Sequence, residues 1–175
     1  MISRVEGIFV KGLEFNQPPK DCAAELRDLH QYWTSIHPKA GLPGRQHFNP
    51  ADIAHLLPRL WLVDVVGDPM RFRFRLVGTG ITTFTGREST GKWLDEVYDD
   101  FRNTGAHRRI CQCASDGKPL FQQDGEVISN PEYGTIRAER LYLPLASNGK
   151  KVDIIVIMTN YLDARPKSDS RKSSF

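Results

Sequence analysis

The segment RFRFRL, residues 71–76, decides the fold, because apolar residues alternate in it with arginines. A period of two is typical of an antiparallel β-strand with one buried face, and it places Phe72, Phe74 and Leu76 on the inner side. The mostly apolar segment 60–66 comes before it, and the turn Gly67-Asp68-Pro69 separates the two. Together these segments predict a β-hairpin.

Two helices are expected before this hairpin. The first covers residues 22–37, with Asp21 as its N-cap, and the second begins at the cap Asn49 and ends at Pro58. The first helix has one apolar face, because its large apolar residues recur at intervals of three and four. These residues are Leu26, Leu29, Trp33 and Ile36.

After the hairpin, short helical segments are expected at residues 81–84 and 93–97, and a longer helix at 104–116 that ends at Gly117. Three segments rich in β-forming residues follow and are separated by turns, so they predict an antiparallel meander. They are residues 120–128, 136–145 and 152–162. The order of elements predicts an α+β domain with helices on one face of a five-stranded antiparallel sheet.

The composition indicates one globular domain, since the chain has 175 residues, 39% of them hydrophobic and 26% charged. The longest apolar run, residues 154–158, is too short to span a membrane, and the first residues do not resemble a signal peptide. We therefore expect a cytoplasmic protein with its three cysteines reduced. The net charge of +3 and the alternation of the arginines with core positions argue against a nucleic-acid interface.

Two segments of this chain, residues 71–79 and 86–96, resemble the PAS superfamily. The chain is most similar to the bacterial branch of stand-alone PAS proteins that carry an N-terminal helix, and residues 52–64, 139–145 and 152–153 support this. The resemblance covers residues 22–162. It implies N-terminal helices at 22–58 after an extension at 1–21, and a PAS core at 59–162. The basic, serine-rich composition of residues 163–175 predicts a disordered tail.

The resemblance implies a five-stranded antiparallel sheet in PAS order, with helices that enclose a pocket against its inner face. It also implies a sensory or scaffolding function in bacterial signalling, without catalysis, in which the domain binds an unidentified small molecule, a signalling protein partner, or both. We expect polar contacts to a ligand from Thr79, His107 and Arg140. The full set of residues expected to bind the ligand is Phe74, Leu76, Thr79, Phe84, Trp93, Leu94, His107, Arg140, Tyr142 and Met158.

No cofactor is identified by the sequence. Haem coordination by His107 is an alternative, because haem-binding PAS domains take their axial histidine from the long helix. A flavin photosensor would need a reactive cysteine before that helix, and none occurs between Cys22 and Cys111. Cys111 and Cys113 point to different sides of a helix, so no metal site is expected.

The alternative to a binding module is a small cone-shaped α+β enzyme of the isomerase type that acts on an apolar metabolite. Such an enzyme needs a buried carboxylate, and Asp64 and Glu139 are the candidates. We favour binding, because an apolar pocket with a few polar groups is typical of a ligand site.

The apolar face of the first helix has two alternative partners. It covers either the chain's own sheet, which gives a monomer, or a second copy, which gives a homodimer with Trp33 buried at the two-fold axis. The glycines at 41 and 44 would let the helix swing away from the domain. We therefore expect a dimer interface formed by Leu26, Leu29, Trp33 and Ile36.

Overall fold

A computed structural model describes residues 13–130 and 134–162 of the chain. The predicted tail 163–175 and most of the predicted extension 1–21 lie outside these residues. The centre of the fold is one antiparallel sheet of six strands in the order β1-β4-β5-β6-β2-β3. The strands are β1 (Leu13–Phe15), β2 (Leu60–Val66), β3 (Arg71–Val77), β4 (Leu120–Asn130), β5 (Gly134–Leu145) and β6 (Ile154–Leu162).

Five of these strands match the predicted ones, and their α+β arrangement is confirmed. The sixth, β1, adds an edge next to β4. Its three residues are too few to show a period in the sequence, so the prediction missed it.

The predicted long helix and the caps that identify it are present. Helix α4 (Gly105–Asp116) begins after Thr104, whose hydroxyl accepts a hydrogen bond from the His107 amide at 3.2 Å, and Gly117 ends it with φ of 59°. The other helices are α1 (Ala24–Ser35), α2 (Thr79–Thr85), α3 (Leu94–Val97) and the short 3-10 helices η1 (Arg45–His47), η2 (Pro50–Ile53), η3 (Leu57–Arg59) and η4 (Phe101–Asn103).

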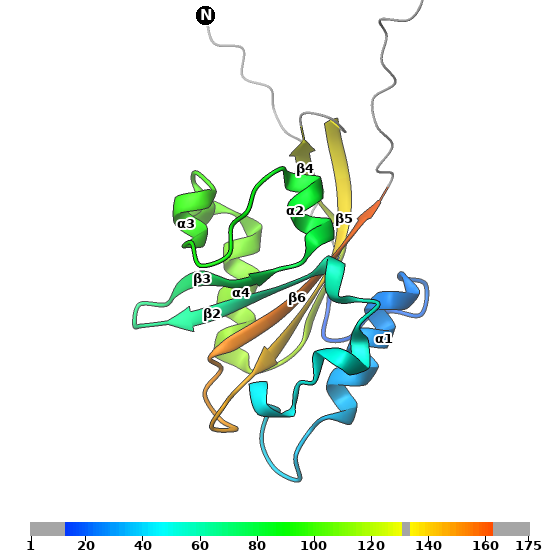
Figure 1. Cartoon of the computed structure of the whole chain (residues 1–175), viewed down its shortest axis with the longest axis vertical. Helices are drawn as coiled ribbons and strands as arrows, with labels where there is room; N and C mark the ends of the chain where they lie inside the picture. Colours follow the sequence, from blue (N-terminus) through cyan, green and yellow to red (C-terminus); the bar gives the residue numbers. More distant parts are fainter. Residues whose placement is uncertain (1–12, 131–133, 163–175) are drawn as a thin grey trace, which may run out of the picture.

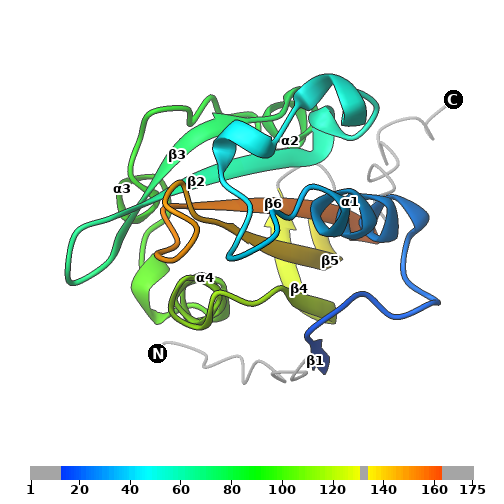
Figure 2. The same ribbon diagram turned by 90° about the horizontal axis from the view of Figure 1, so that it is seen from below.

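Helices cover both faces of the sheet, as Figures 1 and 2 show. We call the face under α2, α3 and α4 the inner face, and the face under α1 and η1 to η3 the outer face. Along β6, Ile155 and Ile157 belong to the inner apolar cluster, whereas Ile154, Val156 and Met158 belong to the outer one. A strand buried on both sides needs apolar residues at every position, which explains the continuous apolar run 154–158.

Helix α1 packs on the outer face of its own sheet, which corrects the prediction of a dimer interface. Leu26 and Leu29 are fully buried, and Trp33 keeps 6% of its surface exposed. The indole Nε1 of Trp33 donates a hydrogen bond to the backbone oxygen of Pro144 in β5 at 2.9 Å. Ile36 is half-buried and packs against the same cluster. The apolar face is therefore covered within one chain, so it offers no surface to a second copy.

The start of α1 is bound by Glu139, a residue of β5 that lies far from α1 in the sequence. The N-cap is Ala23 and not the predicted Asp21, and the Ala23 amide donates to Oε2 of Glu139 in β5 at 3.3 Å. The Asn160 side-chain nitrogen donates to the same oxygen at 3.3 Å. Glu139 thus binds α1 to the outer face of the sheet.

Candidate functional site

The predicted pocket residues do not form a single pocket. Phe74, Leu94 and Tyr142 lie together on the inner face, where each is at most 3% exposed and belongs to one apolar cluster. Phe74 packs on Trp61 with ring centroids 5.6 Å apart. The centre of the predicted pocket is therefore filled by the side chains that were expected to line it.

Leu76 and Met158 lie away from the inner face, which corrects two residues of the prediction. In β3, Phe74 pairs with Val63 and Leu76 with Leu62, so Arg75 is an extra residue that forms a β-bulge. The bulge reverses the alternation, and Leu76 therefore faces the outer side with 44% of its surface exposed. Met158 is buried in the outer cluster.

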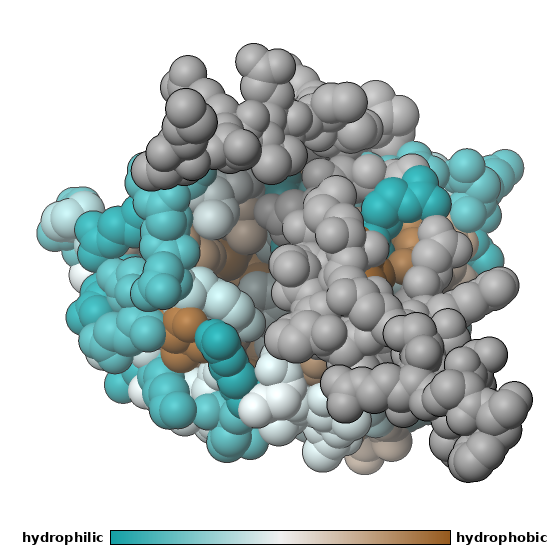
Figure 3. Space-filling view, turned by 90° about the horizontal axis from the view of Figure 1, so that it is seen from above, coloured by the Kyte–Doolittle hydropathy of each residue, from teal (hydrophilic) through white to brown (hydrophobic). Residues whose placement is uncertain are grey.

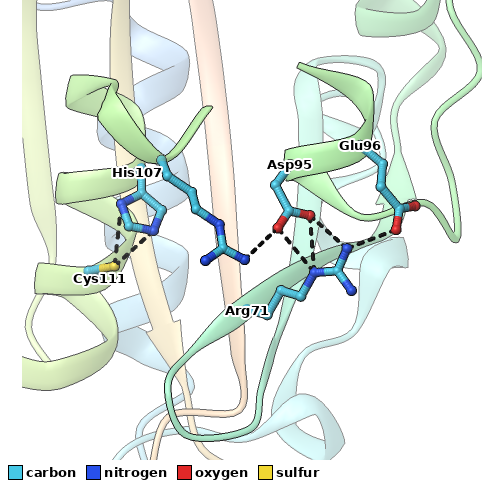
Figure 4. A network of polar contacts seen from close by, with 6 residues as sticks. Arg71, Asp95, Glu96, His107 and Cys111 are labelled. Carbon is cyan, nitrogen blue, oxygen red and sulfur yellow. Dashed lines mark hydrogen bonds and ion pairs between the residues drawn. The ribbon is translucent and has the colours of Figure 1, made fainter. Parts of the chain in front are cut away.

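His107 lies at the rim of the inner face, next to an ion-pair network (Figure 4). Trp93 contacts the same network. The guanidinium of Arg71 lies 4.2 Å from the centre of the Trp93 ring, in a cation–π contact. Arg71 binds Asp95 at 2.9 Å and Glu96 at 2.8 Å. This network joins the edge strand β3 to α3.

Asp95 is the central acid of the network, because Arg102 also binds it, at 2.8 Å. Hydrogen bonds from Arg71 and Arg102 lower the pKa of Asp95 from 3.8 to about 2. Burial lowers the pKa of His107 below its usual 6.5, and the cation of Arg102 acts in the same direction. Both effects favour the neutral form of the His107 imidazole.

The surroundings of His107 do not fit haem. The hollow beside it, between Asp95 and Phe101, measures about 10 Å³, which is the space of one water molecule. Rings of Phe72 and Phe101 contact the imidazole edge to face, at 5.7 and 5.3 Å between centroids. A cofactor-sized ligand needs a pocket of several hundred Å³.

A larger cleft of about 430 Å³ lies where α2, η3 and the end of β6 meet. Thr79 and Phe84 are the two predicted residues that line it. On its other wall Tyr161 of β6 stacks on Phe84, with ring centroids 3.8 Å apart and 20° between the planes. Burial raises the pKa of Tyr161 to about 12, so its hydroxyl stays protonated.

Close packing of α2 on η3 forms the wall of this cleft. A Cβ atom at Gly78 would lie 2.3 Å from the Leu57 carbonyl oxygen, and one at Gly80 would lie 2.8 Å from that of Pro58. Only glycine permits the two backbones to come this close. The two glycines therefore fix the position of α2 beside the end of β6.

Arg140 belongs to a polar row that crosses the inner face. Its neighbour on β4 is Gln122, and its neighbour on β6 is Thr159, which lines the cleft. The Thr159 hydroxyl accepts a hydrogen bond from Trp61 Nε1 at 3.1 Å. Gln122 is 1% exposed, and its side-chain oxygen Oε1 has no hydrogen-bond partner among the residues that the structure describes.

The two carboxylates of the enzyme alternative have partners on the outer face. Asp64 binds Arg73 at 3.1 Å and Arg75 at 2.9 Å, and Glu139 holds α1 as described above. Neither carboxylate lines the cleft. Within the described residues, no group of three metal-binding side chains comes together.

Sequence reasoning missed Gln122, Thr159 and Tyr161. A glutamine or threonine in a strand is usually exposed, and only the pairing of β4, β5 and β6 shows that this row is buried. The one available signal was register, because residues opposite each other in neighbouring strands share a face.

The comparisons with known proteins concern the fold and the family. The structure of an RNA-binding Light-Oxygen-Voltage receptor is similar with a TM-score of 0.43 and 14% identity, and the match covers 74% of this chain but only 37% of that receptor. The light-state structure of the blue-light photoreceptor Aureochrome1 LOV is similar with a TM-score of 0.37 and 17% identity, over 63% of this chain and 86% of that one. No curated protein matches the chain.

Figure 3 shows one face of the molecule, where patches of apolar surface lie next to hydrophilic residues. None of the described helices is both long enough and apolar enough to cross a membrane. The family model of the PAS domain matches residues 22–159, which include α1, the helices over both faces, β2 to β5 and most of β6. The chain therefore belongs to the PAS domain family.

Proposed function

We propose that this chain is a non-catalytic PAS domain of bacterial signalling that acts as a scaffold by binding a protein partner. The observation that carries the proposal is the packing of the inner face. Phe74, Leu94 and Tyr142 fill the place where a ligand was expected, and each is at most 3% exposed. Because the domain's own side chains fill its central pocket, the pocket has no room for a ligand. We therefore assign recognition to the surface of the domain.

The exposed apolar side chains support recognition at the surface. Among the described residues, the large apolar side chains that remain exposed are Val66, Leu76 and Tyr98. Leu76 follows Arg73 and Arg75 in β3, whose side chains are nearly half exposed although they bind Asp64. Arginine and tyrosine contribute strongly to protein interfaces.

Capture and reconstitution test this proposal. The tagged chain is captured from native lysate, and each protein that copurifies in comparable amount is expressed, purified and titrated against the chain by calorimetry. We expect one partner that binds the purified chain directly. Turnover of a small metabolite by the purified chain, without any direct protein partner, would support the isomerase-type alternative.

A small ligand on the inner face is the second candidate, and Gln122 favours it. Leaving a buried acceptor without a partner costs about 1–3 kcal/mol, so a bound donor next to Oε1 would stabilise the fold. Arg140, the cross-strand neighbour of Gln122, carries five N–H donors. A small molecule that copurifies with the wild type and is lost in Gln122→Leu would establish this candidate in place of the scaffold.

A further inference from the structure

Within residues 13–130 and 134–162, no second strand covers the edge at the end of β6. Strand β2 begins at Leu60, which pairs with Met158, whereas β6 continues to Leu162. The last four residues of β6 therefore pair with β5 alone, over about 13 Å at about 3.3 Å per residue. Figure 1 shows this part of β6 continuing past the start of β2.

The backbone of Tyr161 points to this uncovered side. Backbone groups of successive residues in an antiparallel strand point alternately to the two neighbouring strands. The Val65 amide of β2 points to β6, where it donates to the Asp153 oxygen at 2.9 Å, and alternation along β2 directs Trp61 to β6 as well. Trp61 lies opposite Ile157, so the N–H and C=O of Ile157 and, four residues later, of Tyr161 are directed to the β2 side. Among the described residues, no hydrogen bond reaches the N–H and C=O of Tyr161.

The cleft of about 430 Å³ lies directly against this edge. Thr159, Asn160 and Tyr161 form its β6 wall, and α2 and η3 form the opposite wall. The cleft thus combines an unpaired strand edge with apolar surface from Pro58 and Phe84. Such an edge binds extended chains, because the backbone supplies the hydrogen bonds and side-chain pockets supply specificity.

The charge of the lining favours an acidic partner. The described residues of the lining include one cation, Arg59, and no carboxylate. Arg59 binds Glu25 at 3.0 Å, and both side chains keep at least 40% of their surface exposed. An exposed ion pair of this kind exchanges its partner at little cost.

We propose that this cleft binds an extended, acidic segment of the protein partner, which adds to the sheet as a strand next to Tyr161. The segment exchanges hydrogen bonds with the N–H and C=O of Tyr161, its apolar side chains contact Phe84 and Pro58, and a carboxylate lies near Arg59. This proposal rests on the proposed function, since it assigns the partner's chemistry and its site.

A library of random octapeptides displayed on phage is the probe. It is selected on the wild type and then tested on Thr83→Trp, which places a large side chain in the cleft from an exposed position of α2. Thr90→Trp, at an exposed position outside the cleft, is the matched control. We expect peptides rich in acidic and β-branched residues that bind Thr83→Trp at least tenfold more weakly and Thr90→Trp unchanged. Selected peptides that bind Thr83→Trp as tightly as wild type would overturn the site, as would failure to select any peptide.

Backbone pairing has its own test. On addition of a selected peptide, the Tyr161 amide should exchange with solvent at least tenfold more slowly, measured by nuclear magnetic resonance. Tyr161→Pro removes the N–H and should abolish binding, whereas Tyr161→Ala, the control, keeps the N–H and should retain part of it. Unchanged exchange at Tyr161 would overturn strand addition.

The reconstituted protein partner separates failure of this site from failure of the proposed function. A partner that binds Thr83→Trp as tightly as wild type would remove the cleft as its site and leave the scaffold function intact. A small molecule retained by wild type and lost in Thr83→Trp, with no protein partner, would overturn both.

Discussion

Replacing Trp33 tests whether α1 belongs to the core of the monomer. The side chain is 6% exposed and packs among outer-face residues, so Trp33→Ala should lower the free energy of unfolding by about 3–5 kcal/mol. Trp33→Phe keeps most of the apolar contact but leaves the Pro144 oxygen without its donor, at a cost of about 1–3 kcal/mol. Urea denaturation followed by circular dichroism measures both values.

Gln31 provides the matched control, because it lies on the exposed side of the same helix. Gln31→Ala should change the free energy of unfolding by less than about 0.5 kcal/mol. A dimer interface predicts a different result. If Trp33→Ala converted a dimer to a folded monomer of unchanged stability, our placement of α1 on its own sheet would be wrong.

Further predictions concern β3, the ion-pair network and the cap of α1. Leu76→Lys should change the free energy of unfolding by less than about 0.5 kcal/mol, whereas Phe74→Ala should lower it by about 3–5 kcal/mol. Urea denaturation measures both values, and equal effects would contradict the bulge at Arg75. Because the pKa of Asp95 is lowered in the folded state, the ionised Asp95 stabilises the fold above about pH 4, and this contribution should fade as the pH falls from 4 to 2. The contribution should be absent from Asp95→Asn. Parallel acid titrations of the melting temperature of both proteins would show this. Glu139→Leu should lower the free energy of unfolding by about 1–3 kcal/mol, because it leaves the Ala23 amide unpaired. Glu139→Gln keeps an acceptor oxygen and should lower it less. Equal losses in thermal denaturation would contradict the capping role.

Local periodicity predicted most of the sheet. The alternation of Phe72 and Phe74 with arginines gave the correct inner face of β3, but the same rule failed two residues later at Leu76. A bulge is a single extra residue, and Arg75 differs in no visible way from Arg73 before it. The error therefore came from pairing, which depends on β2 as well as β3.

The position of α1 illustrates a signal that was present but not used. The run Ile154 to Met158 is apolar at every position, and a strand of this kind is buried on both faces. A second layer had to cover the outer face, and the apolar stripe of α1 was the available cover. The apolar face of α1 was thus predictable from the sequence of the helix, and the sheet face that it covers was predictable from the sequence of β6.

The polar parts of the candidate site depend on long-range pairing. Gln122, Arg140 and Thr159 become neighbours only through the register of three strands, and Tyr161 meets Phe84 across 77 residues of chain. Short-range patterns contain no information about such contacts. The cleft could not be predicted for the same reason.

Native mass spectrometry of the chain purified from its own cells tests the scaffold proposal most directly, because it reports polypeptide partners and small ligands in one spectrum. We predict a complex whose mass is that of the chain plus a second polypeptide, and a dissociated chain that carries no small molecule. A chain without a polypeptide partner that retains one small molecule per copy would contradict the proposal.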